Sequence, residues 1–161
     1  MIRPATAADA AAIARIYDHY VRHTAVTFEE VSVPTAEMAA RIDRFLAAGL
    51  PYLVLEQGDR VVGYAYAGGW HARSAYRFAV ETTIYLEAAT VGAGLGTRLY
   101  GALLERLSTL GLHTAIGVIT IPNPASVALH EKLGFRPSGR LQEVGFKQGR
   151  WIDVGYWQRP L

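Results

Sequence analysis

The sequence contains no cysteine and only two methionines among its 161 residues. The lack of cysteine excludes disulfide bonds, thiolate metal sites and cysteine nucleophiles. No apolar run approaches the about 20 residues that a membrane-spanning helix needs. Acidic Asp9 also interrupts the N-terminal stretch, where a signal peptide would have an apolar core. We therefore expect a cytoplasmic protein that does not insert into a membrane.

An excess of charge of one sign is also missing. The chain has 16 basic and 14 acidic residues, a net charge of +2, and its basic residues are scattered singly along the sequence. Nucleic-acid-binding proteins gather such residues into a patch, so we expect no nucleic-acid partner. With 51% hydrophobic and 19% charged residues, the composition is that of one globular domain, covering residues 1–161.

The first third of the chain predicts two helices. Thr6 followed by Asp9 is a variant of the capping box, and apolar residues then recur at helical spacing, so we expect a helix over residues 7–22. The stretch HTAVTFEEVSVPT mixes β-branched residues with a proline and predicts an irregular connector. A second helix is expected from Thr35 to about residue 48, ending at Gly49.

The remainder alternates between strands and helices. Two apolar, β-rich runs around residues 57–60 predict an antiparallel hairpin, and the chain closes with two strands that turn at Gln148-Gly149. Between these hairpins we expect a strand over 77–88, a helix over 95–110, a strand over 113–121 and a helix capped by Asn123 and Gly134. The predicted fold class is α+β, with a mainly antiparallel mixed sheet and helices on both faces.

Glycines at positions 92, 94 and 96 lie between the strand and the helix of the middle region. Backbone N–H groups and the helix dipole at such a turn favour anionic oxygen, above all phosphate. A P-loop would need a lysine directly after the last glycine, and a dinucleotide fingerprint would need glycine or alanine at Thr97 or Leu99. Both patterns are absent. A tight turn that binds no ligand remains the alternative.

Five further segments carry more specific motifs than the glycine loop. They are TFE at 27–29, GYAYAG at 63–68, R-x-AY-x-x-x-VE at 73–81, IPNPAS-x-x-LHEKLGF at 121–135 and GFK-x-G-x-W-x-DVGYWQ at 145–158. Together with the loop VGAGLG at 91–96, they resemble the GNAT N-acetyltransferases over nearly the whole chain. Within that superfamily they look most like the branch that acetylates phosphinothricin and methionine sulfoximine.

The resemblance implies acetyl-CoA as co-substrate, with its pyrophosphate in the glycine loop, and it implies no metal. It also implies a homodimer, in which the aromatic C-terminal strands would serve the interface. Relatives commonly have Arg or Gln where this loop begins with Val91, so we expect weaker CoA affinity, which Val91→Arg would tighten. The expected cofactor-binding residues are Ile84, Tyr85, Leu86, Gly92, Ala93, Gly94, Leu95, Gly96, Thr97 and Asn123.

Two side chains are candidates for the chemistry. Glu81 interrupts an otherwise apolar strand, where an unpaired carboxylate would be costly, so it faces either an ion-pair partner or a water-filled site. By resemblance, Glu81 is the general base, acting through water. The helix that follows Asn123 often presents a tyrosine to the CoA sulfur in the superfamily, and the matching residue here is His130. Histidine can donate a proton near neutral pH, although a buried histidine with a packing role is the alternative.

By resemblance, Phe28, Arg73 and Tyr76 line the acceptor side. The planar guanidinium of Arg73 suits the α-carboxylate of an amino acid, while a position on the surface is its alternative. Lys147 is a further residue of interest. His19 and His23 lie four residues apart, but they lack the intervening glutamate and a third ligand, so we expect no metal site.

The sequence thus predicts an acetyl-CoA-dependent N-acetyltransferase that acts by direct transfer on the α-amine of a small amino-acid-like acceptor. Phosphinothricin, methionine sulfoximine and methionine sulfone are the types of acceptor that the resemblance implies. Two alternatives stay open. The acceptor could be another amine, such as an aminoglycoside, a polyamine or a protein N-terminus, or the chain could be a non-catalytic CoA-binding sensor.

Overall fold

After a short first strand, strands and helices follow one another in the order that the sequence predicts. The computed structural model describes residues 1–90 and 92–161. The strands are β1 Ile2–Pro4, β2 Tyr52–Gln57, β3 Arg60–Gly69, β4 Ala79–Leu86, β5 Thr114–Ile121, β6 Arg136–Lys147 and β7 Arg150–Pro160. The helices are α1 Ala10–His23, α2 Thr35–Ala47, α3 Leu95–Thr109 and α4 Pro124–Lys132. Short 3-10 turns, which the sequence did not predict, occupy Ala7–Asp9, Ser74–Tyr76 and Ala88–Thr90.

The first helix begins three residues later than expected, because Ala7–Asp9 forms a 3-10 turn. The predicted interaction between Thr6 and Asp9 is present, since the Thr6 N–H donates to Asp9 Oδ2 at 2.8 Å. Both Asp9 oxygens also accept from Arg3 on β1, at 2.7 and 2.8 Å, and these bonds lower the pKa of Asp9. The first turn is therefore tied to the sheet.

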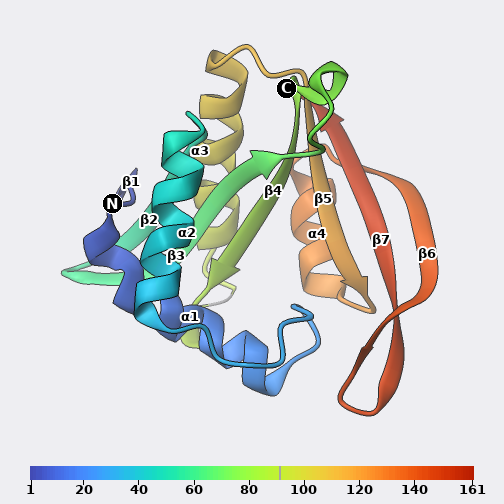
Figure 1. Cartoon of the computed structure of the whole chain (residues 1–161), viewed down its shortest axis with the longest axis horizontal. Helices are drawn as coiled ribbons and strands as arrows, with labels where there is room; N and C mark the ends of the chain where they lie inside the picture. The colour runs from blue at the N-terminus through green and yellow to red at the C-terminus, as the bar shows by residue number, and fades with distance from the viewer. Residues whose placement is uncertain (91) are drawn as a thin grey trace.

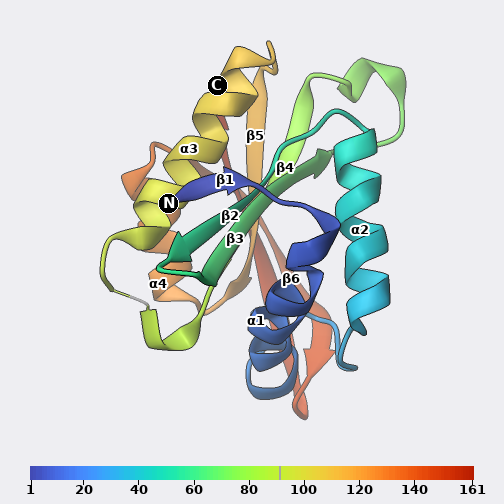
Figure 2. The same cartoon turned by 90° about the vertical axis from the view of Figure 1, so that its left-hand side faces the viewer.

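The seven strands form one sheet in the order β1-β2-β3-β4-β5-β7-β6. Only β4 and β5 run parallel, and every other neighbouring pair is antiparallel. Helices α1 and α2 cover one face of the sheet and α3 and α4 the other (Figures 1 and 2). Each face has its own apolar core. The predicted fold class is confirmed.

β4 and β5 separate after a short paired region. Their pairing runs only from Ala79 with Thr114 to Thr82 with Gly117, and beyond this point the two strands diverge (Figure 1). The Ala79 carbonyl accepts from Trp70 N–H and the Glu87 N–H donates to the Val62 carbonyl, so the odd-numbered backbone groups of β4 face β3. Because these groups alternate along a strand, those of Ile84 and Leu86 face the open edge toward β5.

None of the helices in the described part of the chain is long and apolar enough to cross a membrane.

Candidate functional site

A cavity of about 280 Å³ lies where β4 and β5 separate. It brings together segments far apart in the sequence: β4, β5, the start of α4, β7 and the connector between α1 and α2, residues 24–34. Six predicted site residues line it: Phe28, Glu81, Ile84, Tyr85, Asn123 and His130. The carboxylate expected as base and the histidine expected as acid therefore face one space.

Glu81 lies in the paired part of β4, opposite Gly68 of β3 and Ile116 of β5. Because side chains alternate along a strand, Glu81 shares the face of Tyr85, which packs against α1. The carboxyl is half-buried, and burial raises its pKa, while the nearby His71 acts in the opposite direction. Among the described residues, Glu81 has no ion-pair partner. Of the two alternatives from the sequence, an ion pair or a position facing a site, the structure has the second, because Glu81 lines the cavity.

His130 is 4% exposed and uses both ring nitrogens in hydrogen bonds. Nδ1 lies 2.8 Å from the Ser126 carbonyl, which can only accept, so Nδ1 carries the proton. Nε2 lies 3.0 Å from the Tyr100 hydroxyl, which in turn lies 2.6 Å from the Thr82 hydroxyl. Burial lowers the pKa of His130, and the hydrogen bond to the Ser126 carbonyl, which raises it, does not compensate. The imidazole is therefore neutral at pH 7. The sequence did not reveal this hydrogen-bonded chain, which joins the His130 imidazole to the hydroxyls of Tyr100 and Thr82.

The glycine loop leads into α3 with left-handed backbone angles. Gly92 has φ 97° and Gly94, the residue that precedes the helix, has φ 74°, which side chains rarely adopt. Gly96 is buried in close contact with Leu86 and Leu129. The first N–H groups of any helix lack partners within it, so those of α3 are available to an anion.

Asn123 has the predicted cap role, since its Oδ1 accepts from the Ser126 N–H at 3.2 Å. It also lines a second cavity, which shares residues with the first and follows β4 toward the glycine loop. Ile84, Tyr85 and Leu86 line this second cavity as well. The two cavities together follow the open edge of β4 from Glu81 to its end.

The structure does not bring every predicted residue to the cavity. Arg73 and Tyr76 lie in the exposed segment between β3 and β4, at a 3-10 turn, and neither lines the space around Glu81. Tyr76 packs edge-on against His71, with ring centroids 5.1 Å apart. Their role in acceptor binding stays a prediction. The expectation for Val91 falls on the one residue outside the described ones.

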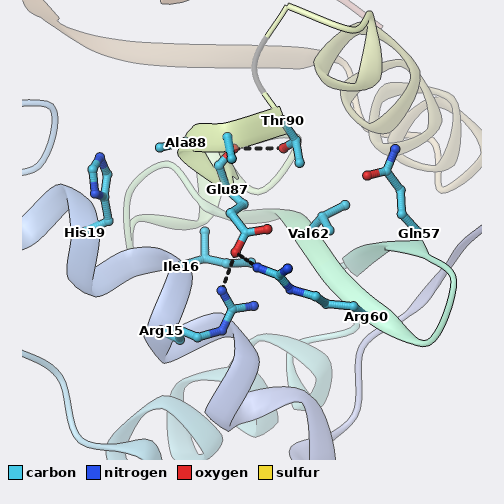
Figure 3. Close-up of a pocket in the computed structure, with 10 residues that line it drawn as sticks. Arg15, Ile16, His19, Gln57, Arg60, Val62, Glu87, Ala88 and Thr90 are labelled. Atoms are coloured by element: carbon cyan, nitrogen blue, oxygen red, sulfur yellow. Dashed lines mark hydrogen bonds and ion pairs between the residues drawn. The ribbon is translucent and has the colours of Figure 1, made fainter.

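A third cavity, of about 460 Å³, lies between α1, the β2–β3 hairpin and the end of β4 (Figure 3). Glu87 points into it and pairs with Arg15 of α1 and Arg60 of β3. Its backbone carbonyl accepts from both the N–H and the hydroxyl of Thr90, each at 2.8 Å. Turn 87–90, which precedes the glycine loop, is thus fastened to two other elements.

Among the described residues, no group of three or more His, Asp or Glu side chains is arranged to hold a metal ion. His19 and His23 lie close together, with ring centroids 5.4 Å apart.

The sequence profile of the acetyltransferase (GNAT) domain matches residues 2–155. The chain belongs to the GNAT acetyltransferase family. Among GNAT relatives, a phosphinothricin N-acetyltransferase of Streptomyces viridochromogenes is 43% identical, over 99% of this chain and 87% of the relative. An L-methionine sulfoximine/L-methionine sulfone acetyltransferase of Salmonella typhimurium is 38% identical, over 99% of this chain and 94% of the relative.

A solved GNAT structure has the same fold as this chain. The phosphinothricin acetyltransferase of Sinorhizobium meliloti, crystallised in complex with acetyl-CoA, matches with a TM-score of 0.96 and 42% identity. The match covers all of this chain and 88% of that protein. The resemblance drawn from the sequence motifs is thereby confirmed, and this GNAT chain is an N-acetyltransferase.

Proposed function

We propose that the chain transfers the acetyl group of acetyl-CoA directly to the α-amine of a small amino-acid-like acceptor. The phosphinothricin, methionine sulfoximine and methionine sulfone types are the acceptors that the similar proteins are named for. One observation carries the proposal above all: the cavity that contains Glu81 continues along the open edge of β4 toward the N-terminus of α3. A carboxylate, a strand edge that is not paired with β5 and the N-terminus of a helix thus lie in one line.

Acetyl-CoA fits this line in a defined direction. The pyrophosphate would bind the free N–H groups at the start of α3, where the helix dipole favours negative charge. The amide-containing arm of the cofactor would run along the edge presented by Ile84 and Leu86, whose backbone groups face away from β3. The thioester would then reach the cavity that Glu81 and His130 line.

In the proposed reaction, Glu81 takes a proton from the acceptor ammonium through water. The neutral amine attacks the thioester carbonyl and a C–N bond forms. The C–S bond then breaks as the CoA thiolate leaves, and the nitrogen gives up its surplus proton, which balances the proton that the thiolate takes up. A raised pKa suits Glu81 to this role, since a base is most effective when its pKa approaches the working pH.

The thiolate needs a proton, and His130 is our candidate donor. Because the imidazole is neutral and its Nδ1 proton is bound to Ser126, it can act as an acid only after gaining a proton during the reaction. A fall in kcat for His130→Asn with an unchanged melting temperature would support this role. Preserved kcat with a lower melting temperature would show that the histidine serves packing alone.

We further propose a homodimer that uses the β6–β7 hairpin. Four large apolar side chains are exposed on these two strands: Leu141, Val144, Phe146 and Trp151. Phe146 and Trp151 contact each other, with ring centroids 5.0 Å apart, and a clustered apolar surface of this kind is typical of an interface. A monomeric mass by sedimentation at micromolar concentration would contradict the homodimer. A cytoplasmic location likewise stays a prediction.

The release of free thiol from acetyl-CoA, measured with a panel of amines, tests the function. The panel contains phosphinothricin, methionine sulfoximine, methionine sulfone, spermidine, an aminoglycoside and a peptide with a free N-terminus. We expect the highest kcat/KM with the first three. A higher kcat/KM with another amine of the panel would assign the enzyme to that class of acceptor. CoA binding without thiol release for any amine would indicate a non-catalytic sensor.

A further inference from the structure

Lys147 is a buried cation at the end of a largely exposed strand. In the twelve residues of β6, only Gly145 and Lys147 are buried, and Lys147 is 3% exposed. Its Nζ donates to the Thr27 carbonyl at 2.8 Å and to the Glu29 carbonyl at 2.7 Å. Burying an ammonium group is unfavourable unless it is hydrogen-bonded, so these two bonds define where the connector lies.

Gly145 contacts Phe28, the residue between Thr27 and Glu29. A β-carbon at position 145 would overlap the ring of Phe28, so the ring rests directly on the backbone of β6. Phe28 is 39% exposed and lines the cavity that contains Glu81. The glycine therefore leaves room for the one aromatic side chain that the connector presents to the cavity.

The residues on either side of Phe28 are held by their side chains as well. The Thr27 hydroxyl lies 2.6 Å from the hydroxyl of Tyr17 on α1. The Glu29 carboxylate accepts two bonds from Arg41 on α2, at 2.7 and 2.9 Å. The connector is thus attached to both helices through side chains and to β6 through its backbone.

Each neighbour of Phe28 is fixed twice, which holds the Phe28 backbone in place, and the ring lies against Gly145. We propose that Lys147 and Gly145 are positioning residues that hold Phe28 at the acceptor end of the cavity and thereby determine acceptor affinity and specificity. The inference rests on the proposed function, because it assigns the end of the cavity near Phe28 to the acceptor.

A role in stability alone is the competing explanation, and steady-state kinetics separates the two. Lys147→Met keeps the apolar stem and removes both hydrogen bonds to the connector. We expect the KM of the acceptor to rise roughly tenfold, because positioning contacts act through geometry, while the KM of acetyl-CoA stays within about twofold. Lys132→Met, at the only other lysine, changes an exposed side chain and leaves both KM values unchanged.

Gly145→Ala provides a second test that does not depend on the lysine. Its methyl group displaces the Phe28 ring, so we expect the same selective rise in the KM of the acceptor. If the effect passes through Phe28, adding Gly145→Ala to Phe28→Ala causes little further change, since the two substitutions remove one interaction. Independent, additive effects would contradict the inference.

Specificity supplies the last readout. With Phe28 displaced, we expect the ratio of kcat/KM for methionine sulfoximine to that for alanine to fall in both variants. An unchanged ratio and an unchanged acceptor KM in folded Gly145→Ala and Lys147→Met would overturn the inference, as would an equal rise in both KM values. Failure of the wild type to acetylate any amino acid would instead contradict the proposed function.

Discussion

The two ends of the site are fastened by different kinds of interaction. At the acceptor end, the buried ammonium of Lys147 binds two backbone carbonyls of the connector. At the cofactor end, the carboxylate of Glu87 pairs with Arg15 and Arg60, whose side chains are 46% and 62% exposed. Buried hydrogen bonds to a charge are stronger than solvent-exposed ion pairs. The connector is therefore held more firmly than turn 87–90.

This difference has a functional meaning. A rigid acceptor end suits the recognition of one small molecule, for which the shape of the cavity decides specificity. In the proposed function the glycine loop would bind through backbone N–H groups, so its task would be to present them to phosphate. If the two ends are independent, substitutions at each should change the KM of one substrate and leave the other unchanged.

Glu81→Gln should have the largest effect, and it should change kcat without changing the KM of either substrate. The amide keeps the size of the side chain but cannot accept the proton, so we expect kcat to fall by roughly 100-fold or more. Both KM values should stay within about twofold of the wild type, since neither Lys147 nor Glu87 is altered. Steady-state kinetics with both substrates varied measures all three constants. A kcat within a factor of a few of the wild type would remove Glu81 from the role of base.

Arg73→Ala tests whether the acceptor end extends beyond the cavity. If the guanidinium binds the α-carboxylate, its removal should raise the KM of amino-acid acceptors by roughly tenfold, because a charge-assisted pair is lost. A simple amine without a carboxylate should be used equally well by both proteins. Retained affinity for amino-acid acceptors would leave Arg73 as a surface residue, as its exposed position at a 3-10 turn allows.

Glu87→Gln should act on the other substrate. Burial would raise the pKa of Glu87, but the hydrogen bonds from Arg15 and Arg60 outweigh it and lower the pKa, so the carboxylate is ionised at neutral pH. Removing its charge frees the turn, and we expect the KM of acetyl-CoA to rise roughly threefold, the scale of an exposed ion pair. The KM of the acceptor should not change.

A matched control separates this effect from a general loss of surface charge. Glu37→Gln removes an exposed carboxylate that pairs with Arg41 on α2 and should leave the KM of acetyl-CoA unchanged. Added salt should reduce the difference between wild type and Glu87→Gln, because ions screen exposed pairs. If Glu87→Gln raises both KM values alike, the two ends are not independent.

The sequence predicted the fold and singled out Glu81, which lines the cavity, because both depend on local patterns, while the roles of the site residues stay predictions. Helical spacing and turn residues identify α3 and α4, and the break in an apolar strand identifies Glu81. The partners of Lys147 and Glu87 could not be predicted in this way. Lys147 lies 120 positions from Thr27, and Glu87 lies 72 from Arg15, so only the folded sheet brings them together. The sequence marked Lys147 as a residue of interest but did not indicate its partners.

The pH dependence of kcat/KM offers the finest test of the comparison, because the group expected to cause it, Glu81, lies at the acceptor end alone. Burial raises the pKa of Glu81, and His71 partly offsets this. If Glu81 is the base, it must be ionised to act, so kcat/KM should fall as the pH drops through this raised pKa. His71→Gln removes the influence that lowers the pKa of Glu81, so this pKa should rise further and the acidic limb should move to higher pH.

The same profile measured in Glu87→Gln should show no displacement, since Glu87 belongs to the cofactor end. Tyr66 and Tyr100 also interact with Glu81, but both stay neutral over this range because burial raises their pKa values. An acidic limb that moves to lower pH in His71→Gln, or that moves equally in both variants, would show that another group controls the profile. The direction of the displacement, measured from kcat/KM between pH 4 and 8, therefore decides whether the charge state of Glu81 is set locally.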